Sequence, residues 1–166
     1  MRFVLVLVAL GLAGLTGVTA GAAPSATPPT VSCDKIILTV GSGRAGGYRV
    51  VLGVVSVPEA YQPQVVATRS RAWPFWRKAG LVIRGGSPPV SVTVPQAWRN
   101  RAAIHWGNSG IVSALRIGSC PRFGDEPWNA YAGGFHLRSP SACVPLIFRV
   151  GNRSATVRFG LGRACK

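Results

Sequence analysis

Two stretches of the chain interleave arginine with tryptophan, and they hold the side chains best suited to bind a ligand. The first covers residues 69–78 and the second residues 98–101, with a further tryptophan at Trp106. Indole faces stack on sugars and bases or lie at lipid headgroups, whereas guanidinium groups bind phosphate and carboxylate through paired hydrogen bonds. The pattern therefore predicts a binding site for an anionic or glycan ligand. Its candidate residues are Arg69, Arg71, Trp73, Trp76, Arg77, Lys78, Trp98, Arg99 and Arg101.

A structural role for these residues is the alternative. The tryptophans would then pack over one end of the domain, with arginines stacked on their outer faces. Trp128, Tyr131 and Phe135 surround Gly133 and Gly134, and they suit either an aromatic platform for a ligand or the core. The core is favoured, because glycines inside a strand mark a bulge.

Residues suited to catalysis are scarce. The carboxylates and histidines of the whole chain are Asp34, Glu59, Asp125, Glu126, His105 and His136. Asp125 and Glu126 are sequence neighbours, whose side chains point apart, whereas a glycosidase needs two carboxylates on opposite sides of one bond. The run Gly107-Asn108-Ser109-Gly110 lacks the G-x-S-x-G spacing of a nucleophile elbow. We expect no enzyme, no catalytic residue and no cofactor.

A glycine motif and the four cysteines each have a simpler interpretation than cofactor or metal binding. Residues 41–46 match G-x-G-x-x-G, but a second strand follows where a dinucleotide site needs a helix, so we interpret them as a turn. The cysteines Cys33, Cys120, Cys143 and Cys165 form no C-x-x-C pair. This spacing favours two disulfides over a zinc site.

The N-terminus has the pattern of a secretory signal peptide. Arg2 precedes an uncharged apolar run over residues 3–15, and small residues follow near position 20. We predict a signal peptide over residues 1–22, a flexible leader rich in Pro, Ala, Ser and Thr over 23–31, and one domain over 32–166. Cys33 lies beyond the proline tract, which disfavours a lipidation box at residues 30–33. No later run reaches the ~18 apolar residues of a membrane helix, so we expect a secreted, soluble protein, either free outside the cell or retained at the cell wall.

The net charge of +15 suggests the kind of partner. Of the 19 basic residues, 16 are arginine, against four acidic residues. Such a surface attracts polyanions, among them teichoic or other anionic wall polymers, anionic lipids and, without sequence specificity, nucleic acid. We therefore favour a binding module for anionic or glycan components of the cell envelope. The alternatives are a cationic membrane-active effector, an interaction protein with an unknown partner, or a charge that reflects codon bias alone.

Short alternating segments predict an all-β domain. We expect strands over 36–40 and 48–57, hairpins pairing 79–84 with 90–94 and 101–106 with 111–117, and a last hairpin over 143–161. Residues 59–77 have no clear period and suit a helical turn over 60–67. About eight strands without an amphipathic helix indicate a disulfide-stapled, immunoglobulin-like antiparallel β-sandwich.

The last hairpin has a register that can be argued from its apolar faces. Pairing Phe148 with Val157 places the apolar side chains of both strands together and turns Arg149 and Arg158 outward. Cys143 then faces Gly162, and a Cys143–Cys165 disulfide needs a bulge at one of the nearby glycines. This register favours Cys120–Cys143 with Cys33–Cys165, although the other pairings stay open.

Three segments carry a resemblance to a known group. They are Tyr48-Arg49-Val50-Val51-Leu52-Gly53-Val54-Val55, Trp76-Arg77-Lys78-Ala79-Gly80-Leu81, and the tail from Trp128 to Phe135 continuing through Cys143-Val144-Pro145-Leu146 to Gly160-Leu161-Gly162. They are similar to small exported proteins of uncharacterised function from high-GC Gram-positive (actinomycete-type) bacteria. The resemblance implies export and a bacterial source, and it provides no catalytic residue.

Overall fold

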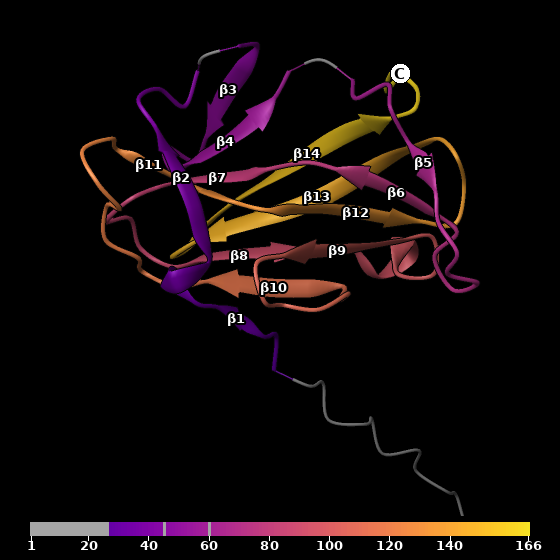
Figure 1. The fold of residues 1–166 in the computed structure, drawn as a ribbon, viewed down its shortest axis with the longest axis horizontal. Coiled ribbons are helices and arrows are strands. Elements are labelled where there is room, and N and C mark those ends of the chain that lie inside the picture. The colour runs from indigo at the N-terminus through magenta and orange to yellow at the C-terminus, as the bar shows by residue number, and fades with distance from the viewer. Residues whose placement is uncertain (1–26, 45, 60) are drawn as a thin grey trace, which may run out of the picture.

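The computed structural model describes residues 27–44, 46–59 and 61–166 (Figure 1). The predicted signal peptide, residues 1–22, and the start of the predicted leader lie outside these ranges. The described residues form 14 strands and two 3₁₀ turns, η1 (Cys33–Lys35) and η2 (Gln96–Trp98), with no α-helix among them. The all-β prediction is therefore confirmed, whereas an immunoglobulin-like sandwich of eight strands is not.

The strands lie in three sheets. In spatial order, sheet A holds β1 (Thr30–Val31), β10 (Ala114–Ile117), β8 (Val90–Thr93), β13 (Ala142–Val150) and β14 (Arg153–Leu161). Sheet B holds β2 (Ile36–Val40), β11 (Trp128–Tyr131), β7 (Leu81–Arg84), β4 (Val55–Pro58) and β3 (Tyr48–Val51). Sheet C holds β5 (Val66–Ala67), β6 (Phe75–Lys78), β12 (Gly133–Leu137) and β9 (Ala102–Trp106).

Sheets B and C continue into each other, as Figure 1 shows along β6–β7 and β11–β12. Only Ala132 separates β11 from β12, and residues 79–80 separate β6 from β7. Sheet A packs against this layer through apolar side chains. Phe135 of β12 lies 5.1 Å from Phe159 of β14, between ring centroids. Tyr131 and Phe135 are fully buried and Trp128 is 8% exposed, so the core interpretation of the aromatic residues around Gly133 and Gly134 is correct.

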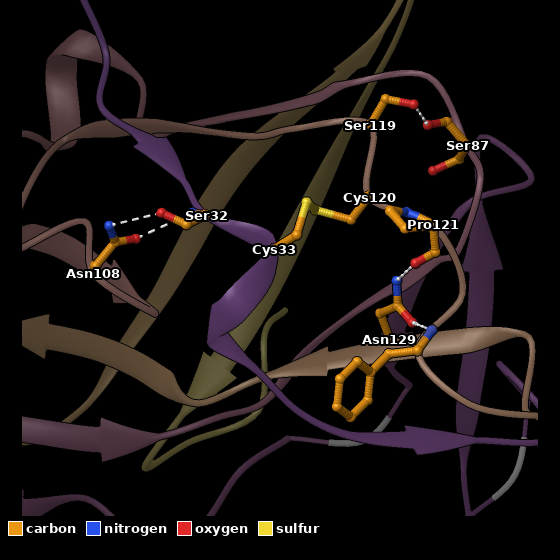
Figure 2. Close-up of a disulfide and its surroundings, with 9 residues drawn as sticks. Ser32, Cys33, Ser87, Asn108, Ser119, Cys120, Pro121 and Asn129 are labelled. Atoms are coloured by element: carbon orange, nitrogen blue, oxygen red, sulfur yellow. Dashed lines mark hydrogen bonds between the residues drawn. A yellow bond between two sulfur atoms is a disulfide. The ribbon is translucent and has the colours of Figure 1, made fainter.

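The predicted hairpin of 79–84 with 90–94 is wrong, because its strands belong to different sheets. The predicted hairpin of 101–106 with 111–117 forms only at its turn, where Ile104 and Val112 make an antiparallel bridge with two backbone hydrogen bonds. β7 lies in sheet B and β8 in sheet A, while β9 lies in sheet C and β10 in sheet A. The loop over residues 85–89 crosses between the layers, tied by hydrogen bonds from Gly86 N to Cys120 O and from Ser119 Oγ to Ser87 O (Figure 2). Alternation identifies a half-buried strand and does not identify its neighbour.

Other predicted boundaries also change. The expected single strand over 48–57 is a hairpin of β3 and β4, which turns at Leu52 and Gly53, both with positive φ. Residues 62–67 are extended, not helical: Gln62 bridges Leu161, and β5 pairs with β6. The domain begins before residue 32, because β1 pairs with β10 and Val31 is only 1% exposed.

The last hairpin is confirmed, with its register displaced by two residues. Phe148 pairs with Ala155, and the loop contains only Gly151 and Asn152. Gly151 has φ +58°, and glycine adopts this conformation at the first position of a two-residue turn without strain. A displacement of two residues keeps every side chain on its predicted face, so Arg149 and Arg158 do point outward, where both are exposed.

The favoured disulfide pairing is wrong: the bonds are Cys33–Cys120 and Cys143–Cys165. β1 runs parallel to β10, so the chain leaves both strands at the same end and brings Cys33 to Cys120 (Figure 2). Cys143 faces Gly160, and the tail folds back over that glycine. A Cβ there would lie 2.6 Å from Arg163 O, so glycine permits the approach that returns Cys165 to Cys143.

Candidate functional site

The structure separates the nine predicted binding residues into several places instead of one. Trp73 and Trp98 each stack with an arginine at one end of sheet C. Arg77 lies on the core side of the sheet, opposite Phe135. Trp76 and Lys78 line a separate hollow. Arg69 and Arg71 are exposed in the loop before Trp73, and Arg99 follows η2. The local geometry of each place decides whether an anion can reach it.

Two arginine–tryptophan stacks meet at the end of sheet C. The guanidinium carbon of Arg138 lies 5.3 Å from the ring centroid of Trp73, and that of Arg101 lies 5.6 Å from Trp98. Arg138 N donates to Arg101 O at 3.0 Å, which joins the stacks. The two predicted stretches therefore do converge, and half-buried Trp73 and Trp98 with stacked arginines fit the structural alternative. Arg138 was not among the predicted residues.

Arg77 lies on the core side of sheet C. It pairs across the sheet with Phe135, which is fully buried, and its Nη2 donates to Gln62 Oε1 at 2.6 Å. Its Nε is buried without a hydrogen-bond partner. Arg77 thus braces the segment around Gln62 and is not part of an exposed anion site.

A hollow beside Trp98 brings three cationic side chains together with a tryptophan. We call it the Trp98 hollow; its volume is about 510 Å³, and it is lined by Trp98, Cys143, Pro145, Thr156, Arg158, Arg163, Ala164 and Lys166. Three of these side chains are cationic and none is a carboxylate. Such a lining attracts anions, and guanidinium groups bind phosphate or carboxylate in a paired geometry.

The hairpin and the tail position this hollow. Pro145 and Arg158 are register partners on the outward face of β13 and β14. Arg163 and Lys166 come from the tail, which the Cys143–Cys165 bond holds against that face. The predicted register places Arg158 on the outward face but does not place it beside Trp98, and the predicted binding residues do not include Arg163 or Lys166. The only signal for these two is the Cys143–Cys165 pairing, which the sequence leaves open as an alternative.

A second hollow contains Trp76 and has a mixed lining. We call it the Trp76 hollow; its volume is about 420 Å³, and it is lined by Asp34, Lys35, Ile37, Trp76, Lys78, His105, Gly107, Ala132 and Gly133. Lys35 Nζ lies 2.8 Å from Asp34 Oδ2. Ile37 is 57% exposed. Trp76 and Lys78 therefore share a surface with a carboxylate and an apolar wall.

The two histidines lie together on sheet C. Their ring centroids are 6.1 Å apart, on the adjacent strands β9 and β12. His105 Nε2 lies 3.1 Å from Gly107 O, and because a carbonyl only accepts, Nε2 carries the proton. His136 Nε2 is buried without a partner. Burial, and to a smaller extent His105, lowers the pKa of His136, so this ring favours the neutral form.

Tyr131 is the other buried titratable side chain with a displaced pKa. Burial raises its pKa to about 12, against a smaller opposing influence of Asn129. The Asn129 amide itself is bonded to Pro121 O and Phe123 N (Figure 2), and the Tyr131 hydroxyl has no hydrogen-bond partner. A neutral phenol enclosed by the core is a structural side chain.

The described part of the chain contains neither a cluster of metal ligands nor a membrane-spanning helix. No group of three or more His, Cys, Asp or Glu side chains is placed there to hold a metal ion. All four cysteines are in disulfides. Among the same residues, no helix is both long and apolar enough to cross a membrane.

The chain matches no protein-family model, no curated protein and no solved structure at a significant level.

Proposed function

We propose that this protein is a secreted, cationic binding module for anionic or glycan polymers of the cell envelope. The observation that supports this function most directly is the Trp98 hollow, where Arg158, Arg163 and Lys166 line the same hollow as a tryptophan and no Asp or Glu side chain lines it. Two disulfides fit an oxidising compartment outside the cytoplasm. The signal-peptide pattern at the N-terminus supports export in the same direction.

The chemistry of the hollow favours phosphate or carboxylate groups attached to a sugar or polyol. The two arginines offer paired donors to an oxyanion, and Lys166 adds a point charge. An indole wall suits the apolar face of a ring, and Arg101 stacked on Trp98 holds that indole in place. A volume of about 510 Å³ suits one repeat unit of a polymer, since ligand sites commonly enclose ~300–1,000 Å³.

Binding to purified teichoic acid, measured over a range of salt concentrations, tests the proposal. The chain without residues 1–22 is compared with the triple variant Arg158→Ala, Arg163→Ala, Lys166→Ala. Loss of three contacting cations is expected to lower affinity at least tenfold and to reduce the slope of log affinity against log salt by ~0.7 for each cation.

A charge-matched control separates a site from a general effect of net charge. Arg44, Arg49 and Arg84 are exposed and lie outside the lining of the Trp98 hollow, so Arg44→Ala, Arg49→Ala, Arg84→Ala removes the same charge elsewhere. We expect this control to bind nearly as well as the unaltered protein. Equal loss in both triple variants would reject the hollow as the site. Dye release from anionic vesicles at the binding concentration would instead support the membrane-active alternative.

A further inference from the structure

The outward face of sheet A forms a track that extends well beyond the Trp98 hollow. We call it the sheet A face, meaning the side chains of β10, β8, β13 and β14 that point away from the core. One row of register partners crosses all four strands, and it consists of Arg116, Ser91, Arg149 and Ser154. Both arginines in this row are exposed, and a small hydroxyl residue follows each of them across the sheet.

A neighbouring row links two hollows on the same face. Its register partners are Ala114, Thr93, Ile147 and Thr156. Thr156 lines the Trp98 hollow, whereas Ala114 and Thr93 line a hollow of about 360 Å³ that also contains Arg99. The predicted residues Trp98 and Arg99 are adjacent in sequence, and each lines one of the two hollows.

The charges on this face have one sign. The cations on the two rows and in the two hollows are Arg99, Arg116, Arg149, Arg158, Arg163 and Lys166. All four Asp and Glu residues of the chain lie elsewhere: Asp34 in η1, Glu59 just after β4, and Asp125 and Glu126 in the loop before β11. None of them lines either hollow. An anionic chain that crosses the sheet therefore meets no Asp or Glu side chain in the rows or hollows named here.

The spacing fits a ligand with repeated charges better than a single anion. Neighbouring strands lie ~4.8 Å apart, so Arg116 and Arg149, separated by β8, are roughly 10 Å apart at their backbones. One phosphate reaches one such position, whereas a flexible chain of phosphates reaches several. Ser and Thr hydroxyls between the arginines can donate to the same oxygens, and their small size lets the chain approach the sheet.

We infer that the ligand is a linear, flexible polymer with repeated phosphate groups, and that it lies across the strands of the sheet A face from the Trp98 hollow to the row of Arg116 and Arg149. This inference rests on the proposed function, because the Trp98 hollow is one end of the track. It goes further in naming the ligand's phosphate chemistry, its minimum extent and its second contact region.

A length series of inorganic polyphosphate tests the extent of the track. Orthophosphate, short chains and long chains are titrated against the protein at fixed salt. Affinity per chain is expected to rise with length until the track is covered and then to level off. The inference would be overturned if the affinity, divided by the number of phosphates in the chain, were the same for short and long chains.

Two variants separate the inference from the proposed function. Arg116→Ser with Arg149→Ser removes the far row and should weaken long chains about fivefold to tenfold while short chains bind as before. The hollow variant Arg158→Ala, Arg163→Ala, Lys166→Ala should weaken both. If only the hollow variant has an effect, the extended track is wrong and the proposed function stands; if neither has one, both fail.

The control is Arg44→Ser with Arg49→Ser, two exposed arginines that belong to neither row nor hollow. It should leave the long-chain affinity within about twofold, and thermal melting should show all three variants folded. Tighter binding of duplex DNA than of long polyphosphate at the same salt concentration would assign the face to nucleic acid and overturn the inference of a flexible chain.

Discussion

The Trp98 and Trp76 hollows differ in their surroundings although the sequence treats their tryptophans alike. Each is lined by a tryptophan from an arginine-rich stretch and by at least two cations. The Trp98 hollow adds cations from β14 and the tail, whereas the Trp76 hollow adds Asp34, His105 and the exposed Ile37. The local motif thus supplies the aromatic wall of each hollow. Segments distant in sequence decide whether an acidic side chain lies beside that wall.

Release of the tail is expected to have the largest effect on binding. Cys143→Ser with Cys165→Ser frees Arg163 and Lys166 from the Trp98 hollow, so we expect polyanion affinity to fall at least tenfold. The loss of this cross-link, which spans 22 residues, should also lower the free energy of unfolding by about 3 kcal/mol. Denaturant titration and the teichoic acid assay measure the two effects.

The other disulfide provides the matched control. Cys33→Ser with Cys120→Ser opens a loop of 87 residues and should cost about 4.5 kcal/mol, yet neither cysteine lines the Trp98 hollow. Its affinity should stay close to that of the unaltered protein wherever the variant is folded. A larger affinity loss here than in the tail variant would contradict the assigned role of the tail.

Replacing each tryptophan with alanine compares the contributions of the two hollows to binding. Trp98→Ala removes the indole wall beside Arg158 and should weaken polyanion binding about tenfold, since stacking on an aromatic side chain contributes ~1–3 kcal/mol. Trp76→Ala should leave it nearly unchanged, because Asp34 stands in that hollow. Isothermal titration of both variants measures the contrast, and similar losses in the two would remove the distinction.

The carboxylate difference gives a smaller effect. Asp34→Asn removes the ion pair of Lys35. It also removes the one acidic side chain from the lining of the Trp76 hollow, which leaves Lys35 and Lys78 there. Polyanion affinity should rise by about twofold, as expected for one exposed charge. Asp125→Asn changes the net charge equally, away from both hollows, and should raise affinity less. Equal gains would mean that net charge alone governs binding.

The smallest expected effect is on the dependence of stability on pH. The pKa of His136 is lowered by burial, with a smaller influence of His105, so below pH 6.5 the unfolded chain takes up a proton that the folded chain resists. Stability should therefore decline as pH falls from 7 toward 5, and His136→Gln should reduce this decline. Denaturant midpoints across that range measure it; a decline identical in the variant would exclude His136 as a cause. Binding at the Trp98 hollow should hold constant, since arginine and lysine keep their charge.

Local patterns in the sequence were sufficient to predict most strands and their buried faces. The last hairpin and the outward direction of Arg149 and Arg158 follow from side-chain alternation, because a two-residue period fixes the face of a strand. The burial of Tyr131 and Phe135 was predicted from the glycines between them. The stretch over residues 98–101 contains both partners of the Arg101–Trp98 stack, whereas Arg138, which stacks on Trp73, lies outside both stretches.

Tertiary structure alone decided which strands are neighbours, and hence the candidate site. The loop after β7 crosses between layers instead of closing a hairpin, and a loop sequence of glycine and proline permits either course. After β9 the chain closes a turn at the Ile104–Val112 bridge, and only then does β10 join sheet A. The parallel pairing of β1 with β10 selected the partner of Cys33, and the tail folded over Gly160 selected that of Cys143. Because Arg158, Arg163 and Lys166 reach Trp98 only through these long-range contacts, no spacing within the sequence could have revealed the hollow that they form.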